Sequence, residues 1–158
     1  MNRKFFALLL TLLIVLALVP ASAYADTGKN SGTEIAVLFT NDVHCAVDKN
    51  LGYQSVALAK ETLEAQGKEV LLVDVGDAVQ GDAIGTLSKG EYIIKIMNEL
   101  GYDVATIGNH EFDYGMDQFK KLNRLADFPY VSANFMDKNG ETVLDAYSMQ
   151  NVHGVKIA

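Results

Sequence analysis

Three short segments of the sequence carry side chains that can bind a metal ion or move a proton. In chain order, these residues are Asp42 and His44, then Asp77, then Asn109, His110 and Asp113. Carboxylate, imidazole and amide groups in one site suit Zn, Mn or Fe, whereas a Mg or Ca site would rely on oxygen ligands alone. If the fold brings the segments together, we therefore expect a transition-metal site.

Each segment directly follows a short apolar run that predicts a β-strand. The runs are residues 34–40, 70–75 and 103–107. In an open parallel α/β sheet, functional groups collect in the loops beyond the carboxyl ends of the strands. The three segments are therefore expected to meet at one end of a single sheet.

Taken one at a time, the same residues have ordinary structural interpretations. Asp42 could form an Asx-turn or cap a helix, and Asp77 could serve a turn. His44 could be a loop histidine with satisfied hydrogen bonds. His110 and Asp113 could be a local hydrogen-bonded pair. The convergence of all three segments favours the functional interpretation over these alternatives.

Apolar residues at helical spacing predict three helices, followed by a fourth strand. These elements span residues 53–66, 88–100, 115–127 and 130–135. Ser88 and Glu91 match the S-x-x-E pattern of a capping box for the second helix, and Gly101 is placed to end it. A glycine-rich loop over residues 76–85 is expected to precede that helix.

The alternation of strands and helices predicts an α/β fold. It implies a mainly parallel sheet with helices on both faces, joined by right-handed crossovers. Two further strands, at 147–150 and 155–158, are expected to be joined by a turn at Asn151–Gly154. Because the sequence stops in an apolar strand, which would leave an exposed edge, we expect residues 34–158 to be part of a longer domain.

The first 25 residues have the pattern of a secretory signal peptide. Arg3 and Lys4 precede an apolar run over residues 5–19, and small residues at Ala23 and Ala25 form an A-x-A site. The run is shorter than the roughly 20 residues of a membrane-spanning helix, so cleavage after Ala25 is favoured over an uncleaved anchor. A flexible leader is expected at 26–33, and the product is expected to be secreted, periplasmic or associated with the cell wall.

The chain is acidic and has one cysteine. Its net charge is −7, and removal of residues 1–25 leaves 11 basic and 20 acidic residues, a net charge of −9. This balance argues against nucleic acid or an anionic membrane surface as a partner. With Cys45 alone, no internal disulfide can form. Cys45 is interpreted as a small buried hydrophobic residue, with a soft metal ligand as the alternative.

Four stretches of the sequence together resemble the calcineurin-like metallophosphoesterases. They are FTNDVH, GDAVQG, GYDVATIGNHEFDYG and FPYVSANF. Within that group they resemble the secreted bacterial 5'-nucleotidases, a family that includes UDP-sugar hydrolases and 2',3'-cyclic-nucleotide phosphodiesterases. The resemblance covers residues 35–158. It implies an incomplete metallophosphoesterase domain that hydrolyses phosphate esters of extracellular nucleotides or nucleotide sugars, with two divalent metal ions.

The resemblance also implies roles for the metal-binding side chains. Asp42 and His44 match the ligands of one metal ion. Asp77 matches the carboxylate that bridges both ions, and Asn109 matches a ligand of the second ion. Two cations so placed would activate a water molecule and neutralise the phosphoryl oxygens during in-line attack.

The third segment supplies the catalytic pair that the resemblance implies. His110 matches a histidine that faces the phosphate without binding metal, and Asp113 matches the carboxylate that orients it. Glu111 has no implied role and is interpreted as structural. Cys45 stands where the family usually has glycine. The family's later metal-binding histidines have no match, since only His153 follows His110 and it is expected in an exposed turn.

Other functions remain open from the sequence. The missing histidines are compatible with a secreted protein that binds metal or nucleotide without turnover. Within the same superfamily, cyclic-nucleotide or thiosulfate-ester substrates are alternatives. The C-terminal substrate domain of the family is also expected to lie beyond the 158 residues.

Overall fold

The computed structural model describes residues 32–49 and 51–158. The predicted signal peptide and nearly all of the predicted leader lie outside the described residues, so both stay predictions. None of the helices in the described part is long and apolar enough to cross a membrane.

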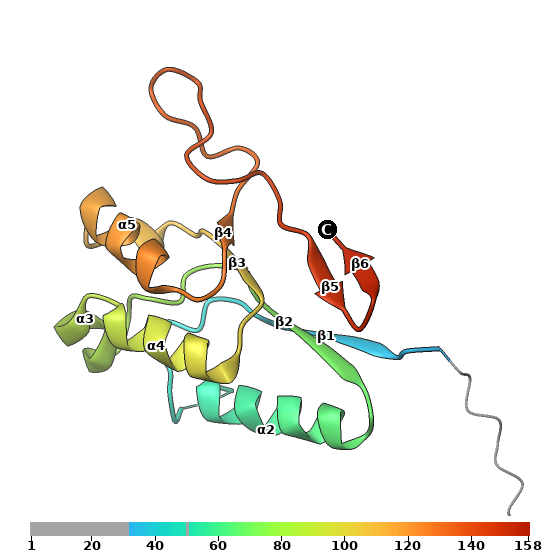
Figure 1. Ribbon diagram of the computed structural model, residues 1–158. Coiled ribbons are helices and arrows are strands. Elements are labelled where there is room, and N and C mark those ends of the chain that lie inside the picture. The colour runs from blue at the N-terminus through green and yellow to red at the C-terminus, as the bar shows by residue number, and fades with distance from the viewer. Residues whose placement is uncertain (1–31, 50) are drawn as a thin grey trace, which may run out of the picture. The chain divides into compact units, whose positions relative to one another are not determined.

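Four parallel strands form the central sheet, in the order β1-β2-β3-β4 (Figure 1). The strands are β1 (Ile35–Thr40), β2 (Glu69–Asp74), β3 (Val104–Thr106) and β4 (Tyr130–Val131). The predicted parallel sheet is thereby confirmed. The fourth strand is shorter than the predicted 130–135, and directly after it the N–H of Ser132 donates to the carbonyl of Asp145 at 2.9 Å.

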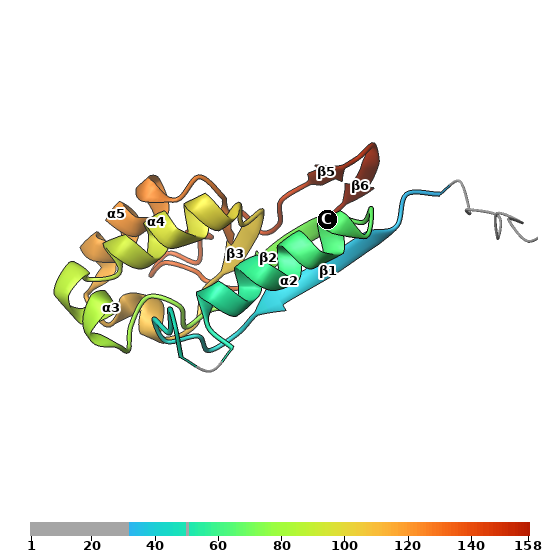
Figure 2. The same ribbon diagram turned by 90° about the horizontal axis from the view of Figure 1, so that it is seen from below.

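The predicted helices are present, but they do not lie on both faces of the sheet. Helices α2 (Tyr53–Ala65) and α4 (Glu91–Leu100) lie on the same side, as Figure 2 shows. The strands follow one another across the sheet in chain order, so right-handed crossovers place successive helices on one face. Residues of β1 reflect this arrangement: Thr40 is buried, whereas Val37 and Phe39, on the opposite face, are 59% and 66% exposed.

The core lies between this helical layer and the sheet. Ile93, Ile94 and Met97 of α4 are fully buried, and Leu72 of β2 packs in the same cluster. Gly101 ends α4 as predicted, because its left-handed conformation, with φ of 67°, reverses the chain at no steric cost to glycine. The last helix, α5 (Met116–Leu125), buries Phe119 and Leu122 in this core.

The predicted capping box is wrong. A short helix that the sequence did not predict, α3 (Ala83–Ser88), begins inside the expected glycine-rich loop and contains Ser88. The N-cap of α4 is Gly90, and the Ser88 hydroxyl donates to the carbonyl of Ile84 at 2.6 Å. The Glu91 carboxylate pairs with Lys121 Nζ at 2.6 Å instead of reaching back to Ser88.

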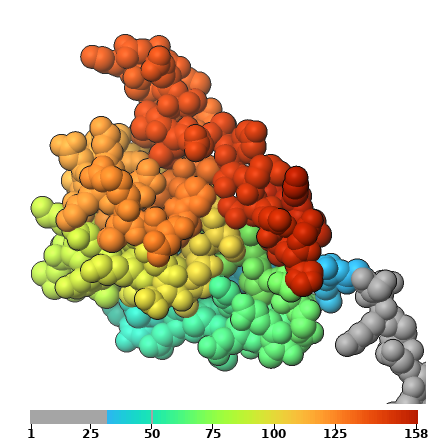
Figure 3. All heavy atoms as spheres, viewed as in Figure 1, coloured from blue at the N-terminus to red at the C-terminus, as the bar shows by residue number. Residues whose placement is uncertain are grey.

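The C-terminal strands form the predicted hairpin with shifted ends. Strands β5 (Gln150–Val152) and β6 (Val155–Ile157) pair antiparallel. His153 and Gly154 form the turn with φ of 49° and 87°, the left-handed backbone that a two-residue hairpin needs. His153 is exposed, as predicted, and its Nδ1 lies 3.3 Å from Glu69 Oε1. In the space-filling view this hairpin (red) lies at the surface (Figure 3).

Candidate metal centre

Asp42, His44 and Asp77 come together at the carboxyl end of the sheet. One ligand atom from each lies within 4.8 Å of the others. Asp42 and His44 follow β1, and Asp77 follows β2, so neighbouring parallel strands deliver them to the same edge. The side chains of Asp42 and His44 are 57% and 38% exposed, which leaves the group open to solvent. The predicted convergence of the first two segments is therefore present.

The three residues share an unusual backbone conformation. Asp42, His44 and Asp77 have φ of 53°, 48° and 59°, the left-handed region that residues with a side chain seldom adopt. The loops hold these angles through backbone bonds: the N–H of Asp42 donates to Gly76 O at 3.1 Å, and that of His44 donates to Asp77 O at 3.0 Å. Such strain clusters at functional sites.

The His44 ring is oriented by the second loop. Its Nδ1 lies 3.0 Å from the carbonyl oxygen of Gln80. A carbonyl oxygen can only accept, so Nδ1 carries the proton and Nε2 is left with a free lone pair. This is the tautomer and the kind of backbone contact that metal-binding histidines use.

The third segment reaches the same place through His110. It follows β3 and forms a short 3-10 turn, η2 (His110–Phe112). The N–H of His110 donates to Asp77 Oδ1 at 2.8 Å, and the rings of His44 and His110 pack edge to face with centroids 4.9 Å apart. The three segments are therefore adjacent. Asn109, just before the turn, is exposed, and its role as a ligand stays a prediction.

His110 and Asp113 form the pair expected from the sequence. His110 Nδ1 lies 2.8 Å from Asp113 Oδ2. The hydrogen bond to Asp113, and secondarily the negative charges of Asp113, Asp77 and Glu111, raise the pKa of His110 above its ordinary value despite some desolvation. The imidazolium form is therefore favoured next to the carboxylate cluster.

Glu111 is a site residue whose contacts the sequence did not reveal. Its side chain is 1% exposed, and its two oxygens accept from the backbone of the second and third loops. No local pattern marks such a residue, because two of its three partners, Asp77 and Ala78, are 34 and 33 positions away in the chain.

Two glycines allow these loops to approach. A Cβ added to Gly76 would lie 2.5 Å from the backbone nitrogen of Gly108, and a Cβ added to Gly108 would lie 2.2 Å from Asp77 Oδ1. Both distances are far below van der Waals contact. The close approach that lets Asp77 receive the His110 N–H therefore depends on glycine at both positions.

Asp74 is a second buried carboxylate that the sequence did not single out. It ends β2, is 3% exposed, and accepts from Thr40 Oγ1 at 2.6 Å and from the N–H of Gly76 at 2.9 Å. Burial raises its pKa to about 7, against the hydrogen bonds from Thr40 and Gly76 that lower it. By accepting the N–H of Gly76, Asp74 holds the start of the loop that carries Asp77.

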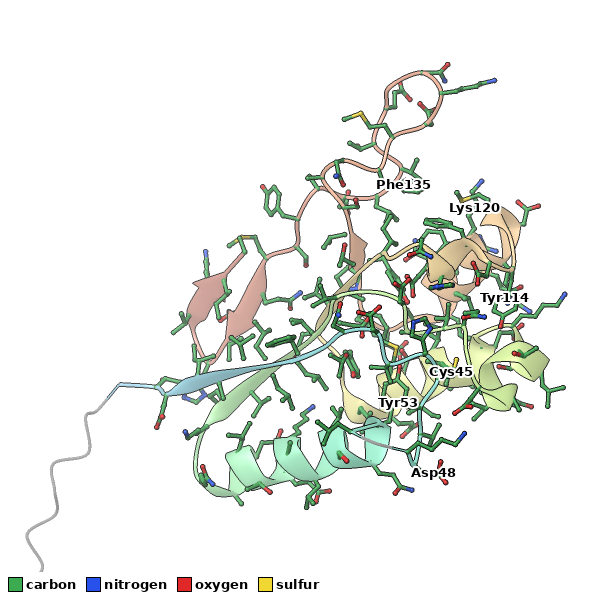
Figure 4. The ribbon with its side chains drawn as sticks, turned by 180° about the vertical axis from the view of Figure 1, so that it is seen from behind. Cys45, Asp48, Tyr53, Tyr114, Lys120 and Phe135 are labelled. Carbon is green, nitrogen blue, oxygen red and sulfur yellow. The ribbon has the colours of Figure 1, made fainter. Side chains whose placement is uncertain are left out.

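Cys45 is fully buried in the core cluster, as favoured from the sequence, and Figure 4 labels its side chain. Its thiol donates to Ala78 O at 3.4 Å, and burial raises its pKa to about 12. A thiol so protonated is a poor metal ligand. A Cβ at Gly85 would lie 2.1 Å from Cys45 Sγ, so the glycine inside α3 makes room for this cysteine.

The sequence is similar to a protein family and to several characterised relatives. Residues 35–156 match the family described as calcineurin-like phosphoesterase. A 5'-nucleotidase of Vibrio vulnificus (strain CMCP6) is 37% identical over 134 residues, covering 79% of this chain and 24% of the relative. A 2',3'-cyclic-nucleotide 2'-phosphodiesterase/3'-nucleotidase of Yersinia enterocolitica is 35% identical, covering 87% of this chain and 24% of the relative.

Solved structures give the same result. A calcineurin-like phosphoesterase from Bacillus subtilis superposes with a TM-score of 0.61 and 30% identity, covering 77% of this chain and 44% of the other. The chain spans about a quarter of the length of the two curated relatives described above.

Proposed function

The chain belongs to the calcineurin-like phosphoesterase family, and on that premise we propose that it is part of an enzyme that hydrolyses phosphate esters of nucleotides with divalent metal ions. The motif resemblance in the sequence pointed to the same family. The observation that carries the proposal is the meeting of Asp42, His44 and Asp77 within 4.8 Å, beside the His110–Asp113 pair.

The donor set fits divalent transition metals. Two carboxylates and an imidazole with a free Nε2 are a combination that suits Zn, Mn or Fe. We assign Asp42 and His44 to one ion, Asp77 to a position between two ions, and Asn109 to the second. Ions bound there would activate a water molecule and offset the charge of the phosphoryl oxygens.

His110 is assigned to the phosphate and the leaving group. Asp113 holds Nδ1, which leaves Nε2 as the donor that can reach a substrate. The hydrogen bond to Asp113 raises the pKa of His110 above its ordinary value, which favours the protonated ring that such a donor needs. His110 would hydrogen-bond a phosphoryl oxygen or protonate the leaving oxygen, and Asp113 would fix the ring and stabilise its cation.

The substrate class is inferred from the relatives. Their names specify a 5'-nucleotidase and a 2',3'-cyclic-nucleotide 2'-phosphodiesterase/3'-nucleotidase. We therefore propose a nucleoside 5'-monophosphate as substrate, with a 2',3'-cyclic nucleotide as the second candidate. The signal-peptide pattern of residues 1–25 supports action outside the cytoplasm.

Release of phosphate from AMP and formation of adenosine monophosphate from 2',3'-cyclic AMP test this proposal. The protein, expressed from its complete reading frame, is stripped with a chelator and assayed with AMP and with 2',3'-cyclic AMP after Mn²⁺ or Zn²⁺ is restored. Hydrolysis of AMP that requires the metal supports the first candidate, and hydrolysis of the cyclic substrate alone supports the second. Turnover of neither substrate, or turnover that persists in excess chelator, would contradict the proposed function.

A further inference from the structure

We propose that Glu111 is a positioning residue, whose buried carboxylate locks the loops after β2 and β3 into their metal-binding arrangement before any metal is bound. The Glu111 carboxylate accepts hydrogen bonds from backbone N–H groups and not from the side chain of Asp77 or the ring of His110. It acts through the backbone of the loops that carry Asp77 and His110. This role deepens the function proposed above and rests on it.

Three backbone N–H groups point at the Glu111 carboxylate. Oε2 accepts from Asp77 at 2.9 Å and from Gly108 at 2.6 Å, and Oε1 accepts from Ala78 at 2.9 Å. Asp77 and Ala78 belong to the loop after β2, whereas Gly108 belongs to the loop after β3. One side chain therefore joins two loops that the sheet alone would leave free to move apart.

The connection is reciprocal. Glu111 receives the N–H of Asp77, and the carboxylate of Asp77 receives the N–H of His110, the residue before Glu111. Each loop thus offers a carboxylate to the backbone of the other. The arrangement fixes Asp77 at both ends, its N–H through Glu111 and its Oδ1 through His110.

The chemistry of this position requires a carboxylate. Both oxygens of Glu111 act as acceptors, which an ionised carboxylate can do and an amide cannot. A glutamine would keep one acceptor oxygen and turn an NH₂ group toward a backbone N–H. Both oxygens are also occupied by the backbone and the side chain is 1% exposed, so Glu111 is not itself free to act as a ligand.

A lock of this kind affects metal affinity. If the loops are already fixed, binding an ion does not have to order Asp77 and the turn at His110. Groups that orient metal ligands typically change metal affinity 10–100-fold when they are removed. The Glu111 side chain is buried and one of its partners, Asp77, has a left-handed backbone with φ of 59°, so the effect is expected within that range.

The test is the Mn²⁺ dissociation constant of Glu111→Gln, measured by titration calorimetry and compared with two controls. Glu64→Gln removes an exposed carboxylate on α2. Met97→Ala destabilises the core near the end of α4 that leads to the start of β3, at the opposite end of the sheet.

We expect Glu111→Gln to weaken Mn²⁺ binding by about 10-fold or more, and both controls to stay within about two-fold of wild type. The proposal is overturned if Glu111→Gln binds as wild type does, or if Met97→Ala weakens binding equally.

A second measurement does not depend on metal binding or on folding of the variant. Amide hydrogen exchange is followed in the metal-free wild-type protein. The N–H groups of Asp77, Ala78 and Gly108 should exchange slowly, because each donates to a buried carboxylate. Exchange of these amides at the rate of an unstructured peptide would contradict the proposal that Glu111 joins the two loops. If wild type binds no Mn²⁺, the proposed function fails, and the exchange rates still decide whether Glu111 joins the loops.

Discussion

His110 Nδ1 lies 2.8 Å from Asp113 Oδ2, three residues along one short turn. The pair stands beside His44, whose ring is 4.9 Å from that of His110, centroid to centroid. A proton donor with its own carboxylate partner therefore adjoins the residues proposed to bind metal. The two contacts support separate roles, in which His44 binds a metal ion and His110 transfers or donates a proton.

Removing the carboxylate of this pair should lower the pKa of His110. Asp113→Asn removes both the charge-assisted hydrogen bond and the nearby negative charge that raise it. The measurement is an NMR titration of the His110 ring in metal-free protein. Asp117→Asn, which removes an exposed carboxylate in the first turn of α5, is the control. An unchanged His110 titration in Asp113→Asn would show that Asp113 does not set its protonation.

Loss of the imidazole should reduce turnover. General acid–base groups typically contribute 10²–10⁴-fold, so His110→Ala should lower kcat for AMP by roughly 10²-fold or more with bound metal. Asp113→Asn should lower kcat less, because the ring remains. His153→Ala removes an exposed histidine of the hairpin turn and serves as the control. Normal kcat in His110→Ala would refute its assigned role.

Asp74 should make stability fall as pH rises from about 4 to about 7. Its pKa is about 7 in the folded protein against 3.8 for an unperturbed aspartate, so the folded state keeps a proton that the unfolded state has lost in this range. The folded state then binds more protons, and the free energy of unfolding decreases with pH. Three pKa units set an upper bound on the order of 4 kcal/mol.

Urea unfolding at several pH values measures this effect. Asp74→Asn cannot ionise, so its stability relative to wild type should improve between pH 4 and pH 7. The comparison between the two proteins removes the contribution of the other titrating groups. A difference in unfolding free energy that does not change with pH would contradict a raised pKa for Asp74.

Gly108→Ala should damage the site through sterics alone. Its Cβ would lie 2.2 Å from Asp77 Oδ1 and 2.9 Å from Asp77 N. We expect a loss of about 1–3 kcal/mol in unfolding free energy, typical of forced overpacking, together with weaker Mn²⁺ binding. Gly32→Ala is the control, since nothing lies within 4 Å of a Cβ there. Wild-type stability and metal affinity in Gly108→Ala would show that the loops have room to separate.

The sequence predicted those features that arise from local pattern. The period of apolar residues around Ile93 and Met97, with Gly101 after them, was enough for α4. The short helix α3 before it is not predicted, because the sequence favours a loop around Gly85. In the structure this glycine is helical, and it makes space for the Cys45 side chain. A packing requirement of this kind cannot be seen in a local pattern.

Some residues of the candidate site could likewise be predicted from the sequence, and others could not. Asp42, His44 and Asp77 could be predicted, because parallel strands deliver the residues after them to one edge. The buried carboxylates Asp74 and Glu111 could not, because their importance lies in contacts across the fold. To predict that the helices lie on one face, the order of the strands in the sheet would also be needed, and the alternation of strands and helices along the chain does not fix that order.

The most direct measurement of the central claim is Mn²⁺ binding by calorimetry, in wild type and in Asp77→Asn. The substitution keeps an oxygen that can accept the His110 N–H and removes only the charge needed by a metal ligand. We predict saturable binding by wild type and binding weaker by roughly 10²-fold or more in Asp77→Asn, since a charged ligand contributes several kcal/mol. Equal affinities in the two proteins, or no saturable binding by wild type, would contradict a metal centre at this end of the sheet.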